Sequence, residues 1–227
     1  MAPTPREQAR AETTEQIKAI ARRHLASDGP DLSLRAVARE LGVVSSAVYR
    51  YFESRDALLT ALIIDGYESL ADAVDAAEAD VARRDLAGRW TAIWHAVRNW
   101  ARERPSEYAL LYGSPVPGYA APQDTIEVAQ RPVVLAVGLL REAVERGADV
   151  PRERVSRAVR ADLADIAQYP GLEGVPPALL ARGMTMWALL FGAVSFELFG
   201  RYGDVIAHPD DYFEHQIRLS LDYLGLS

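Results

Sequence analysis

The sequence predicts an all-α protein of about ten helices, with a small N-terminal domain over residues 1–56 and a larger helical domain over residues 57–227. Segments typical of strands are almost absent, and apolar residues recur at the three- and four-residue spacing of a helix face along most of the chain. Short clusters of Gly and Pro separate these segments, as expected of interhelical loops. Because 49% of the 227 residues are hydrophobic, the chain can bury a substantial core.

The N-terminal domain begins with a polar segment followed by two predicted helices. Residues 1–11 are expected to form a flexible tail, and the first helix covers residues 12–26. Ser33 is a suitable N-cap for the second helix. Gly42 can end that helix, because Gly adopts the left-handed C′ conformation at little cost.

A third helix, which Ser45 or Ser46 can cap, is expected to run to Tyr51. Two short helices joined by a tight Gly turn form a helix-turn-helix, whose second helix fits the major groove of DNA. Arg, Tyr and Ser side chains can bind phosphate oxygens and base edges. The predicted DNA contacts are Ser33, Arg35, Ser45, Ser46, Tyr49, Arg50, Tyr51 and Arg55. The alternative is a small three-helix unit whose charges only keep it soluble.

Seven further helices are predicted after this unit. The fourth, residues 54–83 with Ser54 as its N-cap, is long enough to join the two domains. Pro132 is expected to kink the seventh helix. The other segments are 85–104, a short helix carrying Tyr108 and Tyr112, 125–146, 152–168, 178–199 and 210–224, with loops over 113–122 and 170–177.

Charge is distributed unevenly along the chain, whose net charge is −7. Residues 1–60 carry nine basic and eight acidic side chains, so the acidity lies in the C-terminal part. The net charge of the chain therefore does not argue against DNA binding by the N-terminal domain. No apolar run reaches the roughly 18–20 residues of a membrane span, and the polar N-terminus does not resemble a signal peptide. With no cysteine, disulfides and thiolate metal sites are excluded, and a cytoplasmic protein that does not bind membranes is expected.

The N-terminal motifs resemble the DNA-binding domain of TetR-type transcriptional regulators. The matching motifs are Ser33-Leu34-Arg35, Val37-Ala38, Gly42-Val43, Tyr49-Arg50-Tyr51-Phe52 and Arg55-Asp56-Ala57-Leu58. The match covers about residues 12–65, and Arg55 replaces the Lys that is commoner in the family. The resemblance implies a three-helix helix-turn-helix DNA-binding domain joined to a helical domain that binds an effector and dimerises.

The C-terminal part resembles one TetR subfamily. Tyr112-Gly113-Ser114-Pro115-Val116-Pro117-Gly118-Tyr119 is close to a segment common there, and Phe196-Glu197-Leu198-Phe199-Gly200 also fits. The subfamily often has Trp-x-x-x-His-Gly, which here reads Trp187-Ala188-Leu189-Leu190-Phe191-Gly192. Since Phe191 replaces the His, any role of that His is not carried over.

Large aromatic side chains of the C-terminal part are candidates for an effector pocket. They are Trp90, Trp94, Tyr108, Tyr112, Trp187 and Phe191. Aromatic rings supply apolar walls, while an indole N–H or phenol orients a polar group. The residue pattern alone favours plain core packing, and the family resemblance favours a pocket for an apolar or aromatic effector. Arg98, Asp162 and Asp165 are more simply read as solvated residues than as pocket members.

The last two predicted helices offer apolar area and small residues, which suits a homodimer interface. The candidates are Leu189, Gly192, Phe196, Phe213, Ile217, Leu221 and Leu224. The alternative is packing within one subunit. A dimer is the natural arrangement, because one helix-turn-helix reads too few base pairs and a two-fold dimer reads a palindrome.

The sequence as a whole predicts a ligand-responsive repressor that binds a palindromic operator in double-stranded DNA as a homodimer and is released by a small-molecule effector. No catalytic motif, cofactor fingerprint or metal-binding His spacing occurs, so neither an enzyme nor a cofactor is expected. One alternative is an all-α small-molecule-binding protein or enzyme with a vestigial helix-turn-helix. An activator is another alternative.

Overall fold

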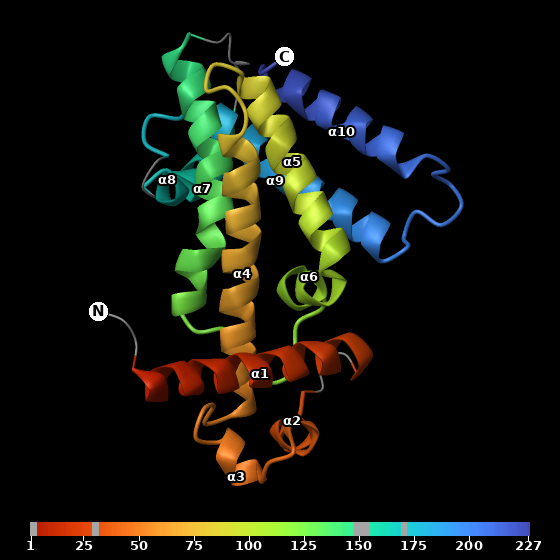
Figure 1. Cartoon of the computed structure of the whole chain (residues 1–227). Helices are drawn as coiled ribbons and strands as arrows, with labels where there is room; N and C mark the ends of the chain where they lie inside the picture. Colours follow the sequence, from red (N-terminus) through yellow and green to blue (C-terminus); the bar gives the residue numbers. More distant parts are fainter. Residues whose placement is uncertain (1–3, 29–31, 148–154, 169–171) are drawn as a thin grey trace. The chain divides into compact units, whose positions relative to one another are not determined.

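The computed structural model describes residues 4–28, 32–147, 155–168 and 172–227, which form ten helices and no strands (Figure 1). The all-α prediction is confirmed. The chain divides into two compact units. The head comprises Met1–Tyr67 and Arg104–Ile126, and the body comprises Glu68–Glu103 and Glu127–Ser227.

The head contains α1 (Pro5–Asp28), α2 (Leu34–Leu41), α3 (Ser45–Val48), the first half of α4 (Arg55–Ala79) and α6 (Pro105–Tyr112). α1 begins at Pro5, so the prediction that residues 5–11 belong to a tail before the helix is wrong. The Glu7 carboxylate accepts hydrogen bonds from the Thr4 backbone N–H (2.7 Å) and the Thr4 hydroxyl (2.9 Å). The Thr4 Oγ1 atom in turn accepts from the Glu7 N–H, which completes a capping box at the helix start.

A single apolar core holds the helix-turn-helix together. Its buried members come from α1, α2, α3, α4 and the turn between α3 and α4, and include Ile17, Ile20, Val37, Ala38, Val48, Phe52, Leu58 and Leu62. Ser33 caps α2, since its hydroxyl accepts the Ala36 N–H at 3.4 Å. Gly42 ends α2 with φ +75°, and the Val43 N–H then donates to the Ala38 carbonyl at 3.0 Å. This left-handed turn at the end of α2 sets where α3 begins.

The head is not the contiguous domain over residues 1–56 that the sequence predicts. α6 and the loop after it pack on the N-terminal helices, because polar and apolar contacts tie them there. Arg22 of α1 forms an ion pair with Glu107 of α6 (3.4 Å), and the Thr60 and Tyr119 hydroxyls are 2.9 Å apart. The predicted boundary at residue 56 therefore does not coincide with the compact units.

The body contains the second half of α4, α5 (Leu86–Glu103), most of α7 (Asp124–Glu145), α8 (Arg157–Ile166), α9 (Pro177–Leu198) and α10 (Pro209–Leu224). α9 packs against α5, α8 and α10. α4 ends four residues before the predicted 83, and α8 spans only Arg157–Ile166 of the predicted 152–168, whose first three residues lie outside the described part of the chain.

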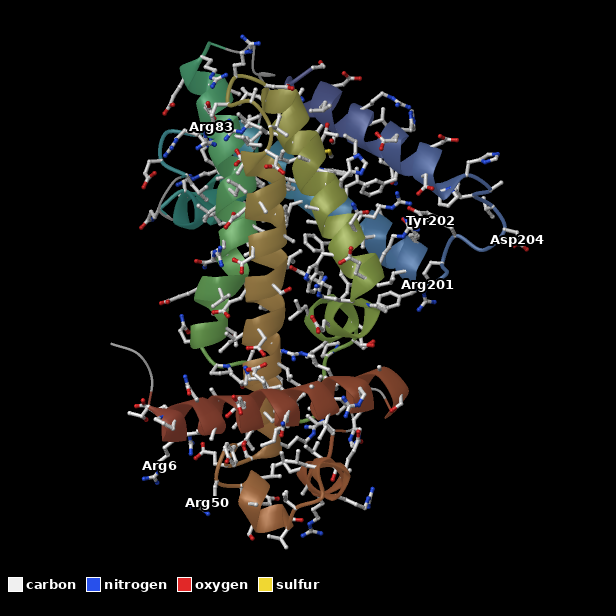
Figure 2. All side chains as sticks on the ribbon, in the orientation of Figure 1. Arg6, Arg50, Arg83, Arg201, Tyr202 and Asp204 are labelled. Carbon is white, nitrogen blue, oxygen red and sulfur yellow. The ribbon has the colours of Figure 1, made fainter. Side chains whose placement is uncertain are left out.

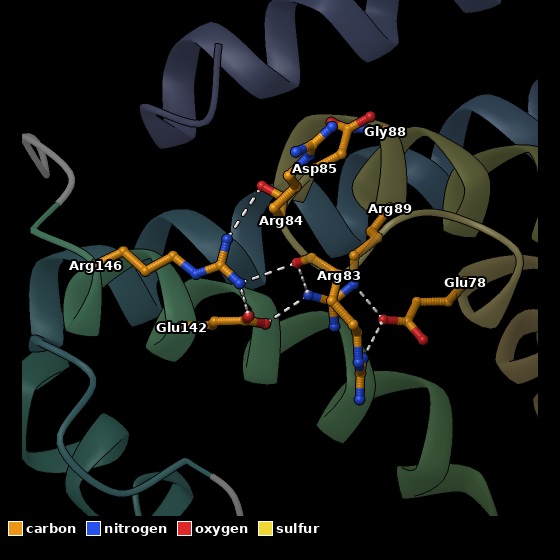
Figure 3. A network of polar contacts seen from close by, with 8 residues as sticks. All are labelled: Glu78, Arg83, Arg84, Asp85, Gly88, Arg89, Glu142 and Arg146. Carbon is orange, nitrogen blue, oxygen red and sulfur yellow. Dashed lines mark hydrogen bonds and ion pairs between the residues drawn. The ribbon is translucent and has the colours of Figure 1, made fainter.

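A buried ion-pair network fastens the end of α4 to the start of α5 and to α7 (Figure 3). Arg89 is almost fully buried and bonds to Glu78, which is equally buried, and to Glu142 (2.5 Å). Burial disfavours the charge, but the hydrogen bonds to Glu142 and Glu78 outweigh it and raise the pKa of Arg89. Arg146 bonds to Glu142 and to the carbonyl of Arg83 (3.0 Å). The charged loop between α4 and α5 is thus held by paired groups.

A second ion-pair network joins α5, α9 and α10. Arg98 is buried and donates to both carboxylate oxygens of Glu197 (2.7 and 2.9 Å) and to Asp210 (2.6 Å). Its guanidinium also lies 4.7 Å above the ring of Phe213. The interpretation of Arg98 as a solvated residue is therefore wrong.

Candidate nucleic-acid interface and ligand-binding core

The recognition segment of the helix-turn-helix, residues 45–52, consists of α3 and the turn after it and presents polar side chains to solvent beside a buried residue. Val48 is buried in the head core, whereas Tyr49 is 46% exposed and Arg50 and Ser46 are exposed. α3 is shorter than predicted and ends at Val48, although the Phe52 N–H still donates to the Val48 carbonyl at 3.1 Å. A helical turn with this exposure can place side chains against base edges and phosphates.

The N-cap of α3 is Val44, whose backbone is extended, so the prediction of a Ser cap is wrong. Ser45 is instead the first helical residue. Because neither Ser45 nor Ser46 is needed as a cap, the exposed hydroxyl of Ser46 is available for another contact.

The eight predicted DNA contacts all lie in the head, on or beside α2, α3 and the start of α4. Five are exposed, namely Ser33, Arg35, Ser46, Tyr49 and Arg50. Ser45, Tyr51 and Arg55 are half-buried. Ser54 accepts the Ala57 N–H at 3.0 Å and so caps α4, which places Arg55 at its first residue.

Arg10 lies beside the recognition segment, although the sequence does not predict it as a DNA contact. Arg10 donates from Nη2 to the Arg50 carbonyl at 3.3 Å, and its guanidinium lies 5.1 Å from the centre of the Tyr51 ring. Figure 2 shows Arg6 and Arg50 on the same side of the head. The signal that could have revealed this helical segment is the capping-box spacing of Thr4 and Glu7, with Pro5 between them.

The predicted pocket aromatics of the body are mainly core residues. Trp90 and Trp94 are 2% and 1% exposed, and their rings lie 6.3 Å apart. Trp90 donates from Nε1 to the Ser220 hydroxyl at 2.8 Å. In contrast, Trp94 Nε1 is buried without a hydrogen-bond acceptor among the described residues. The indole N–H of Trp94 is therefore an uncommitted donor in the core.

A small cavity lies between α5, α7 and α9. Its volume is about 10 Å³, room for about one water molecule. Its lining is apolar and consists of Trp90, Val133, Ala136, Val137, Leu140, Gly183, Met184 and Trp187. A pocket for a drug-sized ligand usually measures about 300–1,000 Å³, so this part of the core is collapsed.

The six predicted pocket aromatics do not gather in one unit. Trp90 and Trp187 border the cavity, and Phe191 packs against Trp187 at 4.9 Å. Tyr108 and Tyr112 belong to the head, where Tyr112 packs edge-on against Tyr67 at 6.0 Å. Burial raises the pKa of the Tyr112 hydroxyl. Tyr108 and Tyr112 thus lie in a different compact unit from the other four candidates, because α6 packs on α1.

A second hollow follows the exposed side of α7 and was not predicted from the sequence. It is an open groove of about 480 Å³. It is lined by Val134, Leu135, Gly138, Arg83, Arg89, Arg141, Glu142 and Glu145. Its Arg89 and Glu142 belong to the buried ion-pair network, so their charges are already compensated.

The predicted dimer residues fall into two groups. Phe196 is 51% exposed, and Leu189, Gly192 and Leu221 are half-buried. Phe213, Ile217 and Leu224 are buried inside the subunit, so their prediction as interface residues is wrong. Phe213 instead packs against Trp94, with ring centres 5.8 Å apart. The neighbouring face of α10 carries the exposed apolar side chains Tyr212, Leu219 and Tyr223.

Among the described helices, α9 is long and apolar enough by composition to cross a membrane, although 39% of its most apolar window is buried inside the structure. No group of three His, Asp or Glu residues within the described ranges is arranged to hold a metal ion.

Comparison with protein families covers both units. Residues 17–62 match the family described as bacterial regulatory proteins, tetR family, and residues 90–219 match the tetracyclin repressor-like C-terminal domain. The chain is 42% identical over 228 residues to the HTH-type transcriptional regulators Rv1816 of Mycobacterium tuberculosis (strain H37Rv) and Mb1846 of Mycobacterium bovis. Each alignment covers 97% of this chain and 95% of the relative.

Solved structures show the same fold. The chain resembles the regulatory protein SCO4313 with a TM-score of 0.79 and 34% identity, over 96% of this chain and all of that one. A protein of unknown function from Rhodococcus sp. RHA1 matches with a TM-score of 0.70 and 23% identity, over 93% of this chain and 95% of that one. The second likeness concerns the fold alone.

Proposed function

Because this chain belongs to the TetR family and is a DNA-binding transcriptional regulator, we propose that it is a repressor that binds a palindromic operator and is released by a neutral, largely apolar effector. Dimerisation, repression and response to a small molecule are typical of the family. The family match over both units favours this function over a small-molecule-binding protein with a vestigial head. The cytoplasm, where the DNA is, is the proposed location.

The observation that carries the DNA-reading part is the exposure of Tyr49 and Arg50 directly beside buried Val48. The core fixes the backbone of this turn, so the segment that carries the two side chains does not have to become ordered on binding. Arg50 can bind a guanine edge or a phosphate, and Tyr49 can donate from its hydroxyl. Arg55, at the first residue of α4, is suited to a phosphate.

The proposed dimer interface uses the exposed sides of α9 and α10. Phe196 on α9 and Leu219 on α10 are each about half exposed, and Tyr212 and Tyr223 continue the face along α10. Gly192 allows a close approach of helices in this region. An interface here would cover the apolar surface that α9 leaves unburied in one subunit.

The effector is proposed to bind in the core bordered by Trp90 and Trp187. Buried charges of the body, such as Arg89 and Arg98, are already paired, so they offer little to a charged ligand. Trp94 does not line the cavity but lies beside Trp90, with ring centres 6.3 Å apart, and its free N–H would suit an effector with a single hydrogen-bond acceptor once this part of the core opens. Because the cavity holds about one water molecule, binding requires a conformation in which the helices move apart, and the effector selects that conformation.

Selection of bound duplexes from a random DNA pool tests this function. The expected product is an inverted repeat whose half-sites lie about 10 base pairs, or a multiple of that, apart. Recovery of sequences with no shared motif, from protein that remains folded and dimeric, would contradict the proposal.

A further inference from the structure

We propose that the first two turns of α1 form a second DNA-contacting surface, in which Arg6 and Arg10 bind backbone phosphates beside the recognition segment. This inference rests on the proposed function, because it assumes that the head binds DNA. It assigns a binding role to residues outside the helix-turn-helix, and it extends the DNA contact to a part of the chain that the sequence predicts to be a flexible tail.

Arg10 is held in place by the recognition segment itself. Its Nη2 donates to the Arg50 carbonyl at 3.3 Å, and its guanidinium stacks over Tyr51 at 5.1 Å. A guanidinium has five N–H donors, and this hydrogen bond uses one of them. Arg10 remains exposed, so its other donors can reach a ligand. A phosphate that contacts Arg50 would therefore have a pre-positioned second cation close by.

Arg6 lies one helical turn before Arg10, because α1 is helical from Pro5. Residues four apart occupy the same face of a helix, so Arg6 continues the line that Arg10 begins. Figure 2 shows Arg6 and Arg50 on the same side of the head. Glu7 lies between Arg6 and Arg10 in the sequence. Its carboxylate accepts hydrogen bonds from Thr4, with which it forms the capping box. The start of α1 thus presents two arginines near the recognition segment.

The charge distribution supports a phosphate ligand. Within the described part of the chain, Arg6, Arg10 and Arg50 form no ion pair with a carboxylate, and neither do Arg35 and Arg39 of α2. By contrast, Arg22 and Arg23, further along α1, pair with Asp65 (2.6 Å) and Glu40 (2.7 Å). Arginines without a carboxylate partner therefore include Arg50 of the recognition segment and Arg10, which contacts it, whereas Arg55 pairs with Asp56 at 3.5 Å. Such cations attract the DNA backbone without reading its sequence.

The test measures how salt affects binding of the full-length protein to a mixed-sequence duplex of about 30 base pairs, which is long enough for two heads. The affinities of the wild type, Arg6→Gln, Arg10→Gln and Arg10→Lys are determined by fluorescence anisotropy over a series of KCl concentrations. Arg84→Gln is the matched control, because Arg84 is an exposed arginine of the body. Circular dichroism confirms that each variant retains its helix content.

We expect Arg6→Gln and Arg10→Gln each to reduce the slope of log affinity against log salt by about 1 for each head, and affinity at 0.1 M salt to fall about eightfold for each head. Arg10→Lys should keep most of the slope because it keeps the charge, and Arg84→Gln should match the wild type. Wild-type slopes in both Gln variants would overturn this inference alone. A folded wild-type protein that binds neither this duplex nor selected DNA would overturn the proposed function as well.

Discussion

Two tryptophans of α5 permit a matched test of the uncommitted N–H in the body core. Trp90 and Trp94 are equally buried, but only Trp90 donates a hydrogen bond, to Ser220. Substituting each by Phe removes the same atoms, so the cost of lost packing is similar and largely cancels between the two variants. The remaining difference reports on the hydrogen bonding of the two indole groups.

The expected difference follows from the partners. Trp90→Phe loses a bond worth about 0.5–1.5 kcal/mol, although Ser220 keeps its own bond to the Ile217 carbonyl (2.7 Å). Trp94→Phe removes a donor that has no acceptor, which should return about 1–3 kcal/mol. The Trp94 variant should therefore be the more stable of the two by about 2–4 kcal/mol. For a chain of this length, the midpoints of thermal unfolding should differ by about 5–15 °C.

Urea denaturation followed by circular dichroism measures this difference, and the two variants should show the same denaturant slope. Equal stabilities, or a less stable Trp94→Phe, would refute the reasoning, because they would mean that the Trp94 N–H is hydrogen-bonded in the folded protein. In a compound screen, a ligand that raises the wild-type melting temperature should raise that of Trp94→Phe by less.

Three further variants test other parts of the structure. Arg50→Ala should weaken binding to the selected operator by about 1–3 kcal/mol without changing the melting temperature, which titration and thermal unfolding check together. Phe196→Arg and Leu219→Arg should each convert the dimer to a monomer in analytical ultracentrifugation, and a dimer in both would contradict the proposed interface. Arg89→Met should destabilise the body by about 3–5 kcal/mol, because it leaves buried Glu78 without its main cation, and an unchanged denaturation midpoint would contradict this.

Local sequence signals were sufficient to predict the helix-turn-helix. Ser33 and Gly42 fix the two ends of α2 through their own hydrogen bonds and backbone conformation, independently of the rest of the chain. The same kind of signal, the capping box of Thr4 and Glu7, also marks the start of α1. The prediction of a flexible tail over residues 1–11 did not take this signal into account. Both signals are local, so the sequence contains them in full.

The register of α10 could not be predicted in the same way. The helix carries apolar residues on two faces, one with Phe213 and Ile217 and the other with Leu219 and Tyr223. Periodicity identifies both faces, but it does not determine which one packs on α5. That choice depends on contacts such as Trp94 with Phe213, which join residues more than a hundred positions apart.

The ion pairs of the body and the position of α6 could not be predicted from the sequence for the same reason. Glu78, Arg89 and Glu142 lie on three helices, and no spacing in the sequence relates the third to the first two. Tyr112 belongs to the head because α6 packs on α1. An interpretation that takes the helices one at a time assigns α6 to the larger domain instead. These two predictions therefore failed where helices distant in sequence meet.

The proposed dimeric reading of a palindrome is tested most directly by the stoichiometry and affinity of the selected duplex. Native mass spectrometry should find two protein chains on each full palindrome. A duplex that retains one half-site should bind at least about a thousandfold more weakly at the same salt, approaching the nonspecific affinity. One chain per duplex, with equal affinity for the half-site and the full palindrome, would contradict the account.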